Sequence, residues 1–330
     1  MSARVVCLGP QILDVLVRPV VEIPAGQGGA LLEEARVTAA GTAAGTAVDL
    51  AKLGGRVTSV GAIGDDAAGR MVRLLLADHG VDTDHLVVKK GLQTSLTVLP
   101  IRPNGERPSL HARGATDALV PGDVDVALVR EADFLHLGGP DVLGEFATTA
   151  VPELLREARA ASTVTTLDML RSHVAPDVAD TLGEVWPLVD YFLPNDDQLR
   201  SLTGIDDLVQ AAQRVRELGV GTVVVTTGAD GSIVVSESGV EVVPALVVPV
   251  VDTTGCGDAY VAGFVTGLGL GWTPSQAARL GTVAAGLVAG GLGSDAGIVD
   301  LESTLRCWRD RADEVGMMPP GAERLPSGRG

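Results

Sequence analysis

The thirteen residues from Asp252 to Phe264, DTTGCGDAYVAGF, combine the features of an anion-binding turn with a carboxylate beside it. Gly255 and Gly257 follow an apolar run, Leu246 to Val251, which we expect to form a buried strand, and precede a segment that we expect to be helical. The first N–H groups of a helix have no partner within the helix, so such a turn suits a phosphate. Asp258 lies in this first turn, where the helix dipole by itself favours an acidic residue. Beside a bound phosphate, the same carboxylate could accept the proton of an attacking hydroxyl.

A second glycine-rich segment lies upstream, with the sequence VGAIGDD from Val60 to Asp66 and LADHGVDT from Leu76 to Thr83. It predicts a strand end, a tight turn, and a helix that is capped by Asp65 or Asp66 and ends at Gly80. A well-formed strand-turn-helix unit would explain this segment without any ligand. The two motifs in this order resemble the N- and C-terminal signatures of the ribokinase-like carbohydrate kinase superfamily, the PfkB family. The resemblance covers the chain to about residue 300.

This resemblance implies ATP-dependent phosphorylation of a hydroxyl group, with a sugar or a related small molecule as acceptor. It implies that Asp258 is the general base. It also implies that the backbone amides of Gly255, Cys256 and Gly257 hold the phosphoryl group as charge develops on its oxygens. Cys256 and Tyr260 stand where the family pattern has alanine and phenylalanine.

The nucleotide contacts that the resemblance implies are spread over three segments of the chain. They are Asn195, Thr226, Gly228, Gly231 and Thr282. Asn195 by itself would be interpreted as a helix N-cap, and the turn that contains Gly228 and Gly231 as an ordinary hairpin turn. Thr282 stands where the family has an asparagine that flanks the adenine.

Two metal sites are implied in the same way. Gln198 replaces the glutamate through which the family helps to hold Mg²⁺ by way of water, and a neutral amide can still orient such a water. Asp196 or Asp197 would be the other source of negative charge. Members of the family that are activated by K⁺ have a site that corresponds to Asp252, Thr254 and Gly293.

The acceptor side matches the family less closely. The expected acceptor contacts are Asp14, Gly41, Gly45, Arg107 and the general base Asp258. Ala40 replaces the first glycine of the family's glycine motif, and Gly45 replaces an asparagine that contacts the sugar. Thr116 also stands where many relatives have asparagine, so we expect an acceptor with a different hydroxyl pattern or with more bulk. Asp168 and Arg171, just past an expected strand end, are further candidates for acceptor or phosphate contacts.

The elements that must position these residues follow from hydrophobic periodicity. Strands are expected at 5–8, 58–62, 134–137, 163–167, 191–193, 222–226 and 233–235, and helices at 46–53, 67–79, 145–160, 196–202, 208–218, 258–268 and 274–289. This alternation predicts an α/β fold with a doubly wound, mainly parallel sheet, whose ligands bind beyond the carboxyl ends of the strands. Residues 12–23 and 86–112 predict a small β-sheet lid. We expect one kinase domain over residues 1–315 and a flexible tail over 316–330.

Composition excludes several classes of partner. The 330 residues contain 25 basic and 42 acidic side chains, a net charge of −17, which argues against nucleic acid and anionic membrane surfaces. The apolar stretch 259–278 is interrupted by glycines and by Pro274, so we expect buried helices there. Three widely spaced cysteines and the absence of a signal-peptide pattern predict a cytoplasmic protein. The resemblance implies a homodimer that pairs through its lids.

Three other functions remain open on the sequence. A nucleoside kinase of the same family would differ only in its acceptor. A sugar- or nucleotide-binding regulator without turnover would explain Gln198 and Gly45, although it would have no need of Asp258. A dinucleotide-dependent dehydrogenase would require GxGxxG after the first strand, and the segment 9–12 offers none.

Overall fold

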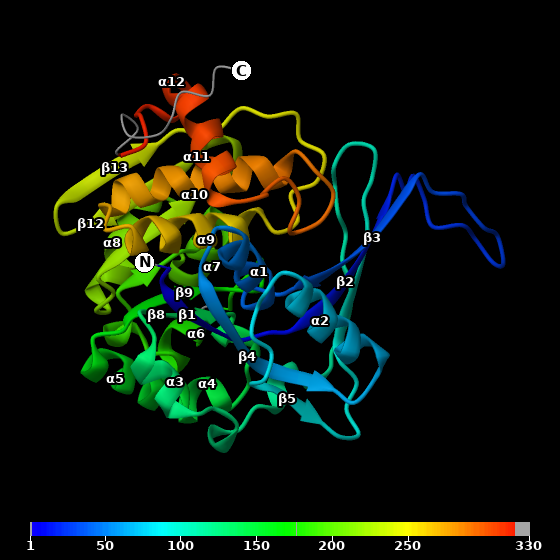
Figure 1. Cartoon of the computed structure of the whole chain (residues 1–330), viewed down its shortest axis with the longest axis horizontal. Coiled ribbons are helices and arrows are strands. Elements are labelled where there is room, and N and C mark those ends of the chain that lie inside the picture. The colour runs from blue at the N-terminus through cyan, green and yellow to red at the C-terminus, as the bar shows by residue number, and fades with distance from the viewer. Residues whose placement is uncertain (1, 176, 321–330) are drawn as a thin grey trace.

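The computed structural model describes residues 2–175 and 177–320, and within them it contains two β-sheets (Figure 1). The larger sheet has the strand order β13 (Gly239–Val243), β12 (Ser232–Ser236), β11 (Thr222–Thr226), β10 (Tyr191–Phe192), β9 (Val164–Asp168), β8 (Phe134–Gly138), β1 (Arg4–Leu8), β4 (Arg56–Gly64) and β5 (Leu86–Lys89). Neighbouring strands pair in parallel from β11 to β5, whereas β12 and β13 are antiparallel additions at one edge. The mainly parallel sheet expected from the sequence is confirmed.

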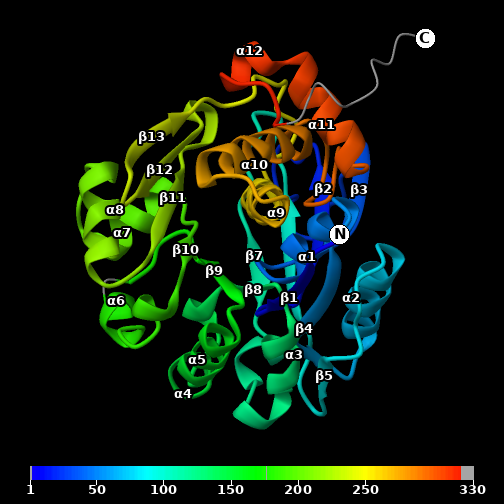
Figure 2. The same cartoon turned by 60° about the vertical axis from the view of Figure 1, so that its left-hand side comes forward.

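Helices cover both faces of the larger sheet (Figure 2). One face carries α3 (Val126–Glu131), α4 (Phe146–Thr149), α5 (Val151–Ala161), α6 (Asp177–Thr181), α7 (Asp196–Thr203) and α8 (Leu208–Glu217). The other carries α1 (Ala44–Lys52), α2 (Ala67–Asp78), α9 (Cys256–Gly269) and α10 (Pro274–Ala289), with α11 (Leu301–Asp310) and α12 (Ala312–Val315) outside α10. Short 3₁₀ turns occur at Ala115–Ala118, Pro121–Asp123, Pro140–Val142, Trp186–Leu188 and Gly228–Asp230.

The strand periodicity explains why there are two apolar cores. Successive side chains of a strand point to opposite faces of the sheet. In β11, Val223 and Val225 therefore pack into the core beneath α7 and α8, and Val224 packs into the core beneath α9 and α10. All three valines are fully buried, as is typical of a parallel sheet that helices cover on both faces.

The smaller sheet, which we call the small sheet, has the order β3 (Glu34–Ala40), β2 (Ile12–Arg18), β6 (Ser95–Pro100) and β7 (Leu110–Ala112). β2 pairs in parallel with β6, and both outer pairs are antiparallel. In Figure 1 the β2–β3 connection extends farthest from the rest of the chain. Two expectations need correction here. Residues 86–89 form β5 of the larger sheet, and β3 was not predicted at all.

Three further elements differ from the sequence-based expectations. Residues 246–251 form no strand, because Pro244 and Pro249 lack N–H donors and only Leu246 of the run is buried. The single helix expected over 145–160 is divided into α4 and α5 around Ala150. Of the expected tail, residues 321–330 lie outside the described residues, whereas Met317 accepts a hydrogen bond from the indole N–H of Trp308. Within the described part of the chain, every helix is too short or too polar to span a bilayer.

Candidate active site

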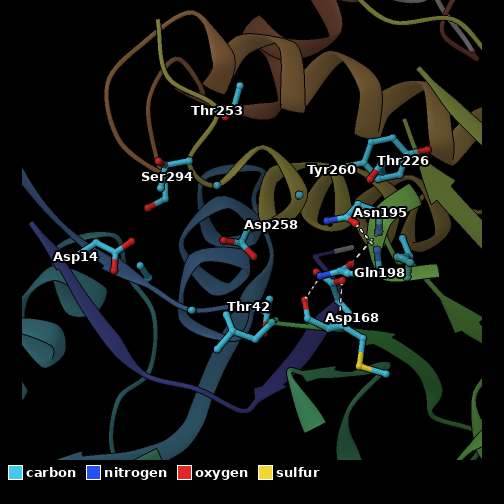
Figure 3. Close-up of a pocket in the computed structure, with 18 of the residues that line it drawn as sticks. Asp14, Thr42, Asp168, Asn195, Gln198, Thr226, Thr253, Asp258, Tyr260 and Ser294 are labelled. Carbon is cyan, nitrogen blue, oxygen red and sulfur yellow. Dashed lines mark hydrogen bonds between the residues drawn. The ribbon is translucent and has the colours of Figure 1, made fainter. Parts of the chain in front are cut away.

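Three adjoining cavities lie beyond the carboxyl ends of the central strands. The central cavity, about 210 Å³, is lined by Asp258 and the turn before it (Figure 3). It shares Thr226, Thr253, Gly257 and Tyr260 with an apolar cavity of about 410 Å³. It shares Asp14, Gly41, Arg107, Leu170, Asn195 and Gln198 with a third cavity of about 620 Å³, which we call the small-sheet cavity because β2, β6 and β7 line it.

The structure brings most of the predicted site residues to these walls. Asp14, Gly41, Arg107, Asn195, Gln198, Thr226, Thr254, Gly255, Gly257 and Asp258 line the central cavity, and Gly228, Gly231, Cys256 and Thr282 line the apolar cavity. Three do not line a cavity. Gly45 lies behind Asp258, and Asp252 and Gly293 lie behind the turn.

The turn at 252–257 is held from behind by Asp252. Its carboxylate accepts the N–H and hydroxyl of Thr254, at 2.9 and 2.7 Å, and the N–H of Gly293 at 3.1 Å. Gly255 has a φ of +80°, and a Cβ there would lie 2.4 Å from the Cα of Ser294, so only glycine fits. The N–H groups of Gly255 and Gly257 have no backbone partner among the described residues. The turn is therefore built to receive an anion.

Cys256 contributes its backbone rather than its thiol. Its N–H donates a long hydrogen bond of 3.3 Å to the carbonyl of Thr253. Burial, with the negative charges of Asp252 and Asp258 outweighing Arg107, raises the pKa of the thiol to about 12. The side chain is therefore a neutral apolar group at physiological pH.

Asp258 lies half-buried in the first turn of α9. Burial, reinforced by the charge of Asp14 and opposed by Arg107, raises the pKa of its carboxyl to about 7. The carboxylate lies directly against α1. A Cβ on Gly45 would stand 2.5 Å from Oδ2 and 3.0 Å from Cγ of Asp258. The absence of a side chain at Gly45 is thus what leaves room for the carboxylate in this position.

One side of the central cavity is formed by residues of the small sheet and of the loop before β7. Asp14, on β2, is buried, and burial raises the pKa of its carboxyl to about 6 although Thr97 and Arg107 favour the ionised form. Arg107 reaches across from the loop before β7 and donates from Nε to the hydroxyl of Thr253 at 3.0 Å. Gly41 has a φ of +90° and would place a Cβ 2.8 Å from the carbonyl of Pro10. The small sheet and the anion turn are therefore directly connected across the cavity.

Asn195 and Gln198 form a brace at the start of α7. Asn195 caps the helix by accepting the N–H of Gln198 at 2.8 Å, and Gln198 Oε1 accepts the N–H of Asn195 at 2.9 Å. Gln198 Nε2 donates to the carbonyls of Met169 and Arg171 at 2.9 and 3.2 Å. The amide therefore joins α7 to the loop after β9, and only one lone pair of Oε1 stays free. Asp196 and Asp197 instead lie beside Arg200.

The apolar cavity is uncharged. Its lining consists largely of aliphatic side chains and glycines from the β11–β12 turn, residues 245–250 and α10. Thr282, on α10, is buried there, and its hydroxyl has no hydrogen-bond partner among the described residues. Gly231 has a φ of +93° and lies against the carbonyl of Val243, so it fixes the turn that forms one wall. Such a slot suits a flat, weakly polar ring with one polar edge.

The loop 291–297, next to the turn, is already bound to cationic side chains. Arg36, on β3, donates to the carbonyl of Leu292 and to the carboxylate of Asp295, both at 2.8 Å. Lys52, at the end of α1, donates to the carbonyl of Asp295 at 2.5 Å. His79 lies 3.3 Å from the same carboxylate. With Lys52 and Arg36, it holds the pKa of Asp295 at about 2 despite burial.

Sequence reasoning missed several groups around the reaction centre. Asp49, on α1, is fully buried, and neither of its carboxyl oxygens has a hydrogen-bond partner among the described residues. Burial, opposed by Lys52 and reinforced by Asp258 and Asp295, raises the pKa of its carboxyl. Thr253 and Ser294 were also missed. Thr253 lies within the DTTG motif and Ser294 follows the glycines at 291 and 293. These glycines indicate tight loops, but they do not indicate what the loops contact.

Comparison with known proteins adds a family relationship to this geometry. Residues 2–300 match the family model described as pfkB family carbohydrate kinase. A fructokinase from Zea mays is 30% identical over 228 residues, which are 67% of this chain and 71% of the fructokinase. A 2-dehydro-3-deoxygluconokinase from Thermoproteus tenax is 32% identical over 262 residues, 76% of this chain and 79% of that one. A crystal structure of adenosine kinase from Sinorhizobium meliloti has a TM-score of 0.82 at 25% identity, covering 93% of this chain and 99% of the kinase.

Proposed function

Because the chain belongs to the pfkB family of carbohydrate kinases, we propose that it transfers the terminal phosphoryl group of ATP to a hydroxyl of a sugar or nucleoside. The observation that carries this proposal is the meeting of three features in one cavity. An anion turn with free N–H groups adjoins a half-buried carboxylate, and the cavity opens on one side to an apolar slot and on the other to a polar chamber.

Asp258 is the general base in this proposal. A pKa near 7 is well matched to a group that must accept a proton at neutral pH, because a substantial fraction of it is ionised beforehand. The N–H groups of Gly255 and Gly257 stabilise the charge that develops on the phosphoryl oxygens, with a weaker contribution from Cys256. Loss of one such donor typically costs on the order of 10²-fold in rate. Arg107, which already reaches Thr253, faces the same oxygens from the acceptor side.

The apolar cavity receives the nucleotide base. Its aliphatic walls suit an adenine ring, and the unpartnered hydroxyl of Thr282 supplies a polar contact at its edge. Thr226, Gly228 and Gly231 line the path toward the central cavity. Asn195 faces the central cavity with the face of its amide that the cap leaves free.

Mg²⁺ is expected to accompany the nucleotide, and the donors of the central cavity fit it. The ion keeps several of its waters and takes few protein ligands. Asp168, Asn195 and Gln198 line the cavity and would hold it through water. When bound, the ion neutralises charge on the phosphate oxygens. Because Gln198 carries no charge and its amide already joins α7 to the loop after β9, Asp168 supplies the carboxyl group for Mg²⁺ in this proposal. Burial and the charge of Asp258 raise the pKa of that carboxyl, so a bound cation would favour its ionisation.

We propose that no monovalent cation occupies the position expected from Asp252, Thr254 and Gly293. Both oxygens of Asp252 are occupied by N–H and O–H donors. The carbonyls of Leu292 and Asp295 are occupied by Arg36 and Lys52. We therefore propose that these two side chains supply the positive charge and that the enzyme does not depend on K⁺.

The small sheet is proposed to act as a lid and as a dimer contact. Its edge strands are β3 and β7, and the β2–β3 connection exposes Val21, Ile23 and Leu31, at 78, 69 and 102%. Exposed strand edges and apolar side chains favour pairing with a second copy. Light scattering would show a dimer of the 330-residue chain. A monomer at micromolar concentration would contradict the proposal. The free thiols of Cys7, Cys256 and Cys307 favour the cytoplasm as the compartment.

The deciding experiment is a coupled ADP-release assay over pentoses, hexoses, sugar acids, sugar phosphates, inositols and nucleosides. Asp258→Asn is the background control. We expect at least one acceptor to raise ADP release well above that control. If none does while ATP still binds, a sugar- or nucleotide-binding regulator becomes the better interpretation.

A further inference from the structure

The small-sheet cavity contains arginine side chains whose guanidinium groups are not all bonded to other protein groups. Three arginines line it, Arg107, Arg113 and Arg171. Arg107 also lines the central cavity and is bonded to Thr253, whereas Arg113 and Arg171 line only the small-sheet cavity. The guanidinium groups of Arg113 and Arg171 make no hydrogen bond or ion pair with any described residue, although both are in the wall of one chamber.

The carboxyl groups in the same wall interact largely with groups other than the guanidinium groups of Arg113 and Arg171. Asp141 accepts the N–H groups of Leu170 and Arg171, one on each oxygen and both at 3.0 Å. Asp14 lies beside Thr97 and Arg107, and burial raises the pKa of its carboxyl to about 6. Asp117 is the remaining carboxyl, and it lies in the turn after Gly114. His111, whose pKa is lowered by burial and by Arg113, donates to or accepts from Thr97 and adds no charge.

The position of these arginines is unexpected for this chain. A net charge of −17 would leave most cavities acidic, and the apolar cavity has no charged residue at all. The phosphates of a nucleotide would lie at the anion turn, in the central cavity that Arg113 and Arg171 do not line. The two guanidinium groups are therefore not placed to hold the phosphates of ATP.

We propose that the acceptor is an anionic sugar, with a carboxylate or phosphate group held by Arg113 and Arg171 and its reacting hydroxyl directed to Asp258. This rests on the proposed kinase function and names its substrate class. Guanidinium groups bind carboxylate and phosphate strongly because their paired N–H donors match two oxygens. A chamber of about 620 Å³ has room for the sugar and its anionic group together. The anionic group and the reacting hydroxyl must lie at opposite ends of the acceptor, since they face different cavities.

The test compares acceptors in matched pairs by the ADP-release assay and, independently of turnover, by calorimetric binding. The pairs are glucose with gluconate, which adds a carboxylate, and fructose with fructose 1-phosphate, which adds a phosphate. We expect one anionic member to have a kcat/KM at least tenfold above its neutral partner, and its advantage to fall with added salt. Which pair responds decides between carboxylate and phosphate.

Two variants locate the effect. Arg113→Gln and Arg171→Gln are each expected to lower kcat/KM and affinity for the anionic acceptor by roughly tenfold to hundredfold, and to lower them by a clearly smaller factor for neutral acceptors. Arg113→Lys should restore part of the loss. Arg56→Gln is the matched control, because Arg56 is also exposed but begins β4, at the end of the sheet away from the cavities.

The outcomes separate the two proposals. Neutral acceptors that are preferred, or anionic acceptors that are unaffected by both arginine variants, overturn the anionic acceptor while leaving the kinase intact. Anion binding that depends on the two arginines, without ADP release above Asp258→Asn, retains the anion site and overturns the kinase. If anionic sugars neither bind nor react, the anion site is wrong whatever the neutral sugars do.

Discussion

Gly45→Ala separates the position of the Asp258 carboxylate, the proposed general base, from the stability of the fold. Gly45 lies in the first turn of α1 with ordinary helical backbone, so alanine introduces no strain in φ. Alanine in a helix is favoured over glycine by about 0.5–1 kcal/mol. On helix propensity alone, the variant would be slightly more stable than the wild type.

The contact with Asp258 determines the functional effect. The new Cβ would stand 2.5 Å from Oδ2, whereas ordinary contacts begin at 3.4 Å, so the carboxylate has to move by about 1 Å. The end of an aspartate can rotate away, which keeps the cost to stability small. A displacement of this size in a reacting group costs up to about 10²-fold in rate, equivalent to about 2.7 kcal/mol of barrier. We expect kcat/KM to fall by roughly that factor, with an equal or higher Tm.

The assay is ADP release with the best acceptor from the screen, together with thermal unfolding of the same preparations. Gly122→Ala is the matched control, since a Cβ there meets nothing within 4 Å and φ is not left-handed. The control should change kcat/KM by less than about twofold. If Gly45→Ala retains activity within about threefold, Asp258 does not work from its position against α1, and the reasoning about this contact is wrong.

Three other predictions follow from the charges around the turn. kcat/KM should rise with pH through a midpoint near 7, the pKa of Asp258 in the free enzyme, and a midpoint below 5 would exclude that group as the base. Between about pH 4 and 7 the native state keeps the Asp258 proton that the unfolded chain has released, so the contribution of this group to the free energy of unfolding falls as pH rises. Asp258→Asn should therefore raise Tm at pH 8 and leave it nearly unchanged at pH 4, as calorimetry can check. Turnover of the wild type should be equal in K⁺, Na⁺ and choline salts, whereas Arg36→Gln should lower Tm and turnover, with K⁺ restoring part of both. Activation of the wild type by K⁺ would contradict the proposal that Arg36 and Lys52 supply this positive charge.

The local motifs of the sequence predicted their own structure well, because the signals are short-range. Pro274–Ala289 was predicted residue for residue as α10, since Thr273 caps it and Pro274 occupies its first position. The turn at 255–258 was predicted from glycine spacing and a helix that follows. The segment 246–251 has the apolar residues of a strand, but Pro249 within it, Pro244 before it and the lack of a partner strand among the described residues prevent one from forming. β-branched residues show that a segment is compatible with a strand. They do not show whether a neighbouring strand is available for it to pair with.

Long-range partners were not predictable from the sequence. Arg36 contacts Leu292 across 256 residues, and nothing in the sequence EARVTAA indicates that its guanidinium binds a distant carbonyl. Asp49 occupies a position in AGTAVDLAK that would ordinarily face solvent, yet it is fully buried because α1 packs between α9 and the sheet. The replacement of asparagine by Gly45 was visible in the sequence, but its consequence was not. It was interpreted as a lost acceptor contact, and the structure adds that residue 45 sets the space available to Asp258.

Two connections join the small sheet to the anion turn, and they approach it from opposite sides. Arg107 binds Thr253 at the front of the turn, and Arg36 binds the loop whose Gly293 is bonded to Asp252 behind it. A movement of the small sheet toward an acceptor would therefore act on both sides of the turn at once. Because Gly255 is packed against Ser294 without room for a methyl group, the turn cannot yield on that side. The acceptor that draws the small sheet inward would thus also set the N–H groups that stabilise the transferred phosphoryl group. Such coupling would make turnover depend on the acceptor and suppress hydrolysis of ATP in its absence.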